Sequence, residues 1–263
     1  MGNHELRIAF AGDRDIAVTV LAHLLELGDR PAALILPDEG RATDDAALVG
    51  LCENAGLFPL VVRAGHLDRT AAVEALRALR LDFLICVHFP FLIRGPVLEA
   101  AAKGVLNLHP AYLPFNRGWH TPSWAILDGT PAGATLHFMT EGLDNGDVVY
   151  QEQIAVDPAD TAHTLYSKLK ALELRVFAEG WRRIREGRID RTAQPEPQAT
   201  FHRRRDLFEP AVQRIDLDGL VRASDLLRRL RALTTSRVNE AAYFEANDRR
   251  YRVQVTITPE GEA

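Results

Sequence analysis

The sequence is poor in the residues and runs that mark several classes of protein. Only two of its 263 residues are cysteines, Cys52 and Cys86, and they stand far apart in apolar surroundings. Disulfide-stabilised secreted domains carry many cysteines, so we expect two buried free thiols in a reducing compartment. No apolar run reaches the roughly 18 residues that a membrane-spanning helix needs. Residues 1–6 also turn polar before an apolar run of signal-peptide length, which favours a soluble, cytoplasmic protein.

The charge balance disfavours one large class of partners. The chain has 31 Lys and Arg residues against 36 Asp and Glu residues, a formal net charge of −5 at pH 7. Proteins that bind the phosphate backbone of nucleic acids usually carry a basic excess. The basic run at residues 203–205 is explained more simply by a solvated loop or helix end. We therefore expect neither a nucleic-acid partner nor a membrane partner.

Three familiar site motifs are absent or incomplete. Gly12 follows the first apolar run, but the next residues lack the further glycines of a dinucleotide-binding Gly-x-Gly-x-x-Gly, so a strand-to-helix turn explains it better. The phosphate-binding Gly-x-x-x-x-Gly-Lys-Ser/Thr motif is absent. His109, His120, His137 and Asp144 lack the compact spacing of zinc ligands, so we expect no metal. A strand histidine such as His137 is explained by a half-buried side chain.

The first half of the chain alternates short apolar runs with helical periodicity. The apolar runs at 6–11, 32–36, 58–62, 82–87 and 104–108 predict strands, and the segments at 15–27, 44–55, 68–79 and 96–102 predict helices. Parallel strands need such crossover helices, so the pattern predicts an α/β fold with a doubly wound, mostly parallel, Rossmann-like sheet. In such sheets ligands bind at the carboxyl ends of the strands.

The second half predicts further elements and a small appendage. We expect a helix at 119–127, strands at 134–139 and 148–154, and a long helix that Asp160 caps. Pro195 and Pro197 mark a linker. Beyond it, Ser224 caps a predicted helix, and 242–246 with 250–257 form a hairpin around residues 247–248. The predicted domains are therefore residues 1–190 and a C-terminal helix plus β-hairpin extension at 191–263.

Two polar residues fall where this fold places its ligands, and a carboxylate follows them in a later loop. Asn107 and His109 lie two apart at the end of the fifth strand and point to one side, and Asp144 follows His109 by 35 residues. An amide can donate to a developing oxyanion, and an imidazole with a pKa of about 6.5 can take a proton at neutral pH. A carboxylate can orient that imidazole. Three polar residues near a strand end are also common without a function.

The sequence motifs around these residues are more specific than the three residues alone. The runs at 104–114, 116–118 and 141–147 together closely resemble the folate-dependent formyltransferases, a family that includes glycinamide ribonucleotide, methionyl-tRNA and nucleotide-sugar formyltransferases. The resemblance covers residues 80–155 strongly and implies the formyltransferase type of α/β fold. It implies Asn107, His109 and Asp144 as the catalytic set, N10-formyltetrahydrofolate as formyl donor and a primary amine as acceptor.

The resemblance also implies where the folate is held. The segment containing Phe89, Phe91, Leu92 and Ile93 matches the region that holds the pterin largely through backbone groups. The loop that starts with Glu141 and Gly142 is expected to close over the same ring. Packing in the core explains the two phenylalanines equally well.

The tail beyond residue 200 bears on the choice of acceptor. Its wording, and that of residues 112–118, resembles the sugar N-formyltransferases, whereas the chain length and acidity fit the methionyl-tRNA and glycinamide ribonucleotide enzymes less well. The resemblance therefore implies a nucleotide-linked, dTDP-linked amino sugar, a place in lipopolysaccharide or glycan biosynthesis, and a homodimer with the apolar hairpin face as an interface. Arg117 is a candidate for the diphosphate, and Trp119 and His120 for the sugar or base. A salt bridge explains Arg117 equally well.

Other functions stay open. They are formyl transfer to another primary amine, of the methionyl-tRNA or glycinamide ribonucleotide type, hydrolysis of formyltetrahydrofolate, and non-catalytic folate or nucleotide binding. Because all three residues of the implied catalytic set, Asn107, His109 and Asp144, are present, a purely binding function is disfavoured.

Overall fold

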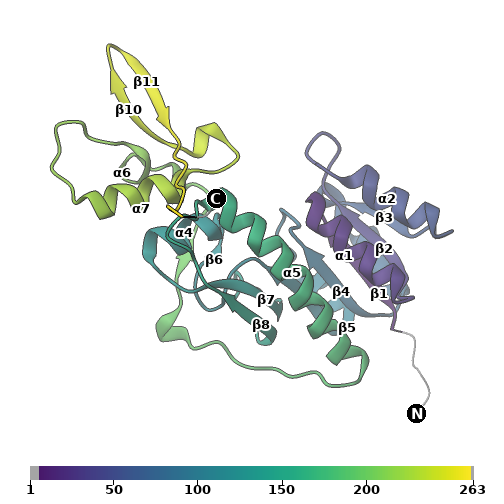
Figure 1. The fold of residues 1–263 in the computed structure, drawn as a ribbon. Coiled ribbons are helices and arrows are strands. Elements are labelled where there is room, and N and C mark those ends of the chain that lie inside the picture. Colours follow the sequence, from purple (N-terminus) through teal and green to yellow (C-terminus); the bar gives the residue numbers. More distant parts are fainter. Residues whose placement is uncertain (1–5, 262–263) are drawn as a thin grey trace. The chain divides into compact units, whose positions relative to one another are not determined.

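The computed structural model describes residues 6–261, and residues 1–5, on which most of the expectation about the N-terminus depends, lie outside them (Figure 1). The chain forms two compact units. The first unit consists of Met1–His109, Thr135–Tyr150 and Glu173–Gln194, and the second of Pro110–Ala134, Gln151–Leu172 and Pro195–Ala263. Among the described residues, no helix combines the length and apolar character that crossing a membrane requires.

The amino-terminal half alternates strands and helices as the hydrophobic pattern predicts. Its elements are β1 (Ile8–Gly12), α1 (Arg14–Glu26), β2 (Pro31–Leu36), α2 (Asp45–Asn54), β3 (Leu60–Arg63), η1 (Ala64–His66), α3 (Thr70–Ala78), β4 (Leu81–Val87), η2 (Gly95–Ala100) and β5 (Ala101–His109). The strands β1 to β5 pair in parallel, in the spatial order β3-β2-β1-β4-β5. The predicted α/β class with a mostly parallel sheet is confirmed.

Two further strands complete the sheet. β7 (Ala132–Phe138) pairs antiparallel with β5, and β8 (Val148–Ile154) follows it at the edge of the seven-stranded sheet. The long helix α5 (Ala162–Arg185) comes next in the chain. β5 therefore stands where the parallel strands meet the antiparallel one, with β4 on one side and β7 on the other.

Apolar side chains of α1 and of the carboxyl-terminal half of α5 contribute to the core of the first unit. α1 buries Ile16, Val20 and Leu24, the positions that its helical spacing predicts. Trp181 of α5 is fully buried and meets the ring of Phe83 edge-to-face at 5.9 Å. Its indole N–H donates to Asp29 at 2.8 Å, which satisfies a polar group that burial would otherwise leave without a partner.

The helix caps differ from the sequence prediction. Asp44, whose residue type and place before the 44–55 segment predict a cap, precedes α2 but makes no capping hydrogen bond through its side chain. Thr161 and Thr164 cap α5 reciprocally: each backbone N–H donates to the other's hydroxyl, at 3.0 Å and 3.3 Å. Asp160 is therefore not the capping residue, and it accepts a hydrogen bond from the Thr164 hydroxyl instead. Ser224 lies inside the first turn of α7 rather than at its cap.

The second unit contains the carboxyl-terminal part of the chain. Two of its elements precede β7: β6 (Arg117–Gly118) and α4 (Thr121–Asp128). The others follow α5: η3 (Glu196–Gln198), β9 (Phe201–His202), η4 (Asp206–Phe208), α6 (Pro210–Gln213), α7 (Ala223–Leu233), η5 (Val238–Glu240), β10 (Ala242–Ala246) and β11 (Arg249–Val253). Trp124, Leu207, Leu233 and Ala242 form its small core. The predicted hairpin is present, but β11 ends at Val253 rather than at residue 257.

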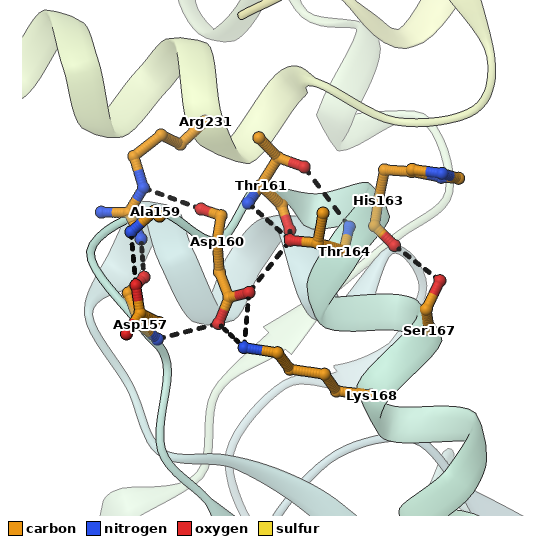
Figure 2. Close-up of polar contacts among 9 residues, drawn as sticks. All are labelled: Asp157, Ala159, Asp160, Thr161, His163, Thr164, Ser167, Lys168 and Arg231. Atoms are coloured by element: carbon orange, nitrogen blue, oxygen red, sulfur yellow. Dashed lines mark hydrogen bonds and ion pairs between the residues drawn. The ribbon is translucent and has the colours of Figure 1, made fainter. Parts of the chain in front are cut away.

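A polar cluster fixes α7 against the start of α5 (Figure 2). Arg231 of α7 donates to the main-chain carbonyls of Asp160 at 2.8 Å and Asp157 at 2.6 Å. Lys168 forms an ion pair with the Asp160 carboxylate at 2.8 Å. Although burial raises the pKa of Asp160, its hydrogen bonds with Lys168, Asp157 and Thr164 lower it by more. The cluster therefore depends on a charged Asp160.

Candidate active site

The site lies at the carboxyl end of β5. Asn107 is paired with Cys86 of β4 on one side and with His137 of β7 on the other, and His109 is paired with Thr135. Because alternate residues of a strand face the same side, Asn107 and His109 share one face. The cross-strand pairing brings His137 to the same place.

The structure brings the three predicted catalytic residues together within the first unit. The Asn107 amide nitrogen donates to Asp144 Oδ1 at 3.2 Å. His109 Nδ1 lies 3.7 Å from Asp144 Oδ2, a distance typical of an ion pair and longer than a hydrogen bond between those two atoms. The side chains of His109 and Asp144 are only 7% and 9% exposed. Low exposure strengthens the electrostatic influence of the carboxylate on the imidazole.

His137 is a fourth member of the site, although its place in a strand predicted only a half-buried structural side chain; it is in fact buried. Its Nδ1 lies 2.8 Å from the carbonyl oxygen of Phe138, which can only accept, so Nδ1 carries the proton. In the tautomer that carries only this proton, Nε2 accepts from the Asn107 amide nitrogen at 3.2 Å, and it also lies 3.6 Å from Asp144 Oδ1. Both amide hydrogens of Asn107 are thus directed at protein acceptors, one at His137 and the other at Asp144.

A buried thiol lies beside the site but is a poor nucleophile. Cys86 is the β4 partner of Asn107 and is buried. Burial strongly raises the pKa of its thiol. Since the thiolate is the reactive species, Cys86 does not suit covalent catalysis. Among residues 6–261, no group of three His, Cys, Asp or Glu side chains is placed to hold a metal ion.

The loop after β7 carries Asp144 in a constrained conformation. Asp144 has a φ of 49°, in the left-handed region that few residues other than glycine adopt. At Gly146 a Cβ atom would lie 2.0 Å from the carbonyl oxygen of Phe138, so only glycine fits there. Backbone geometry therefore determines where the carboxylate points.

The residues expected to hold the folate lie in two loops of the same unit. Phe89 packs against the core, its ring centroid lies 5.6 Å from that of Phe91, and Ile93 belongs to the core. Leu92 is 52% exposed. The side chain of Ile93 is therefore committed to the core, and only its backbone groups are free to recognise a ligand.

The second of these loops is tied to the first. The Glu141 carboxylate accepts a hydrogen bond from the backbone N–H of Gly95 at 2.8 Å. Gly142, the next residue, donates its own N–H to Thr140 at 3.1 Å. The Glu141 side chain thus links the loop of Asp144 to the segment that follows Ile93.

A buried, hydrogen-bonded pair of titratable side chains lies where the first loop leaves β4. His88 has a φ of 50°, and its Nε2 lies 2.7 Å from Glu173 Oε1 of α5. The two side chains are 5% and 0% exposed. The partners are 85 residues apart, so local sequence gave no sign of the pair.

The three residues expected to bind the acceptor belong to the second unit. The guanidinium of Arg117 is paired with both carboxylate oxygens of Glu196, at 2.8 Å and 3.2 Å. These hydrogen bonds lower the pKa of Glu196. The salt bridge left open by the sequence is therefore present, and it occupies the guanidinium.

The neighbouring aromatic residues also have partners within that unit. The guanidinium of Arg204 lies 5.3 Å from the centre of the Trp119 ring. The ring of His120 lies 5.7 Å from that of Phe208, and its Nδ1 is 3.9 Å from Glu240. Burial lowers the pKa of His120 more than the nearby Glu240 raises it.

Comparison with known proteins connects this geometry to one family. The model of the formyl transferase family matches residues 38–180, and the model of the N-formyltransferase dimerization C-terminal domain matches residues 207–259. Methionyl-tRNA formyltransferase of Methylibium petroleiphilum is 33% identical, over 86% of this chain and 74% of that protein. The dTDP-4-amino-4,6-dideoxyglucose formyltransferase of Mycobacterium tuberculosis is 30% identical, over 79% of this chain and 85% of that protein.

A solved structure shares the fold over most of the chain. The N-formyltransferase of Helicobacter canadensis, crystallised with folinic acid and dTDP-3-aminofucose, matches with a TM-score of 0.69 and 20% identity. The match covers 92% of this chain and 85% of that one.

Proposed function

Because this chain belongs to the formyl transferase family, we propose that it transfers a formyl group from N10-formyltetrahydrofolate to a nucleotide-linked amino sugar. The nucleotide in this proposal is dTDP. The ligands of the Helicobacter canadensis enzyme and the name of the Mycobacterium tuberculosis relative support the choice.

One observation carries the catalytic part of the proposal: Asn107, His109 and Asp144 meet at the carboxyl end of β5. The uncharged acceptor amine attacks the formyl carbon, and a carbon–nitrogen bond forms as negative charge develops on the formyl oxygen. The amide of Asn107 donates a hydrogen bond to that oxygen, an interaction worth about 2.7–4 kcal/mol in comparable sites. To do so, Asn107 exchanges one of its two protein acceptors for the substrate oxygen.

His109 moves the proton in this scheme. Its ring takes a proton from the attacking amine and returns one to N10 of the folate as the bond between the formyl carbon and N10 breaks. Asp144 stabilises the imidazolium that forms in between. The transfer is direct, since Cys86 is unsuited to carry the formyl group.

We assign the diphosphate of the acceptor to Arg117. Arg117 suits a diphosphate because a planar guanidinium binds phosphate oxygens through two parallel hydrogen bonds. Its present partner is the exposed Glu196 carboxylate, which a diphosphate replaces on binding. Trp119 and His120 contact the sugar or the base in this proposal.

A panel assay tests the proposed function. The protein is incubated with N10-formyltetrahydrofolate and a set of dTDP- and UDP-linked amino sugars, and tetrahydrofolate release is followed by absorbance. Turnover is expected only when both the donor and a dTDP-linked amino sugar are present. Release without an acceptor indicates hydrolysis, and binding without release indicates a pure binder; either result contradicts the proposal.

Formyl transfer to methionyl-tRNA is a second candidate, favoured by the 33% identity to the Methylibium petroleiphilum enzyme. The same assay with charged initiator tRNA decides between the two. Faster turnover with the tRNA than with every amino sugar rejects the first candidate.

The C-terminal match supports a homodimer. Light scattering coupled to size-exclusion chromatography is expected to give twice the mass of one chain. A monomer at micromolar concentration contradicts this part of the proposal.

A further inference from the structure

We propose that Gln194 is the positioning residue for the catalytic carboxylate and that it acts by holding the main chain on both sides of Asp144. The inference deepens the proposed function and rests on it. Gln194 lies in the segment after α5, 50 residues beyond Asp144. The two main-chain carbonyls that it binds take no part in the proposed formyl transfer, so its effect is transmitted through the position of Asp144.

Gln194 binds the main chain of the Asp144 loop through its side-chain amide. Its side-chain nitrogen donates one hydrogen bond to the carbonyl oxygen of Asp144 at 2.9 Å and another to that of Gly146 at 2.7 Å. Gln194 is only 9% exposed. A primary amide has two hydrogens on one nitrogen, and here both are directed at the loop. Neither a carboxylate nor an apolar side chain of the same size supplies these donors.

This loop needs an external support because its own conformation is unfavourable. Asp144 adopts a left-handed φ of 49°, and such a residue persists only when its surroundings hold it. Gly146 approaches the carbonyl oxygen of Phe138 too closely for any side chain. The two carbonyls that Gln194 binds therefore belong to the strained residue and to the tightest point of the loop.

The neighbouring backbone fixes the position of Gln194 itself. Val148 and Thr192 exchange two backbone hydrogen bonds, at 2.8 Å and 3.0 Å. This antiparallel bridge places the segment of Gln194 alongside the end of the loop. The bridge and the side chain together hold the loop from one neighbouring segment.

The consequence for catalysis follows from the distances of the site. Asp144 contacts Asn107 at 3.2 Å and His109 at 3.7 Å. A shift of its main chain by about 1 Å changes both contacts, and a displacement of that size can cost about 100-fold in rate. Loss of the Gln194 donors should therefore lower kcat through the carboxylate.

A double-mutant cycle tests the inference. Gln194→Met removes both donors, and Gln194→Glu keeps the shape but turns a carboxylate toward two carbonyls. Each substitution is expected to lower kcat by roughly 10- to 100-fold, with the KM of the amino sugar little changed. In the Asp144→Asn background the same substitutions should change kcat by less than about threefold, because residues that act through one group are not additive.

Gln213 provides a matched control. It is also buried, and its side-chain nitrogen donates to two main-chain carbonyls, those of Asn239 and Glu240, in the second unit. Gln213→Met should lower the thermal stability. Its effect on kcat should be the same in the wild-type and the Asp144→Asn backgrounds. A loss of activity that comes only from general destabilisation would appear in this variant as well.

The outcomes separate the inference from the function on which it rests. If Asp144→Asn keeps wild-type activity, the proposed catalytic set is wrong, and the inference falls with it. If Asp144→Asn is impaired but the Gln194 substitutions are harmless, or act equally in both backgrounds, the inference alone is overturned. The Gln194→Glu variant, which preserves the packing, decides the matter if Gln194→Met does not fold.

Discussion

The Asn107 amide nitrogen donates to Asp144 Oδ1 at 3.2 Å, and its other hydrogen is directed at His137 Nε2 at the same distance. Asn107, which the proposed mechanism assigns to the oxyanion, therefore has both amide hydrogens engaged before substrate binds. Because His137 holds its proton on Nδ1 for the Phe138 carbonyl, its Nε2 keeps accepting from Asn107. In the proposed mechanism, the contact with Asp144 is therefore the one that a formyl oxygen replaces.

Removal of the Asn107 amide is the first test of this arrangement. Asn107→Ala should lower kcat by about 100- to 1,000-fold, the effect of losing one donor to an oxyanion. Steady-state kinetics with saturating donor and amino sugar measures the change. The exposed Asn54 provides the control, since Asn54→Ala should leave kcat unchanged. An Asn107→Ala variant within threefold of wild type would assign the oxyanion to another donor.

The buried pair of His88 and Glu173 predicts a large effect on stability. His88→Leu leaves the fully buried Glu173 carboxylate without its 2.7 Å partner. Loss of one member of a buried pair typically costs 3–5 kcal/mol, about the value expected here for the free energy of unfolding. Urea unfolding at pH 7 measures it.

The double substitution distinguishes the charge from the packing. His88→Leu with Glu173→Leu removes both polar groups and should recover most of the lost free energy of unfolding. If the double variant is as unstable as His88→Leu, the cost comes from packing and not from an unpaired carboxylate.

Asp160 predicts a pH dependence of stability. Its pKa is lowered in the folded state by Lys168, Asp157 and Thr164, against the effect of burial. As the pH falls through the ordinary value of about 3.9, the unfolded state takes up the proton first. The contribution of Asp160 is therefore complete above that pH and is lost as the pH falls through the folded-state pKa.

A comparison of variants isolates this contribution. Asp160→Asn should be less stable than the wild type at pH 7, and the difference should shrink at pH values well below about 4. Denaturant unfolding at several pH values measures it, with the exposed Asp218→Asn as the control. A difference that grows toward low pH would reverse the assigned direction.

Much of the first unit could be predicted from local sequence patterns. The alternation of apolar runs and helical periodicity is a local signal, and it indicated the parallel strands and the helices between them. The positions of Asn107 and His109 followed from their spacing at the end of β5. Asp144 was predicted from the family resemblance of its motif, because no spacing rule connects it to His109, 35 positions away.

What the sequence missed depends on contacts between distant segments. His137 joins the site only through the register of β7 against β5. Glu173 meets His88 across 85 residues, and Gln194 reaches its loop across 50. At the start of α5, the sequence prediction placed the cap at Asp160, one residue too early. Only the backbone geometry decided for Thr161.

The most direct test of the central claim is the product that the protein forms with and without His109. The wild-type protein, His109→Asn and the control His66→Asn, which changes an exposed histidine, are each mixed with N10-formyltetrahydrofolate and a dTDP-linked amino sugar. Mass spectrometry then follows the mass of the nucleotide sugar. The account predicts a gain of one formyl group with the wild type and His66→Asn, and a rate lower by about 100- to 10,000-fold with His109→Asn. An unchanged nucleotide sugar with the wild type, or equal rates for all three proteins, would contradict it.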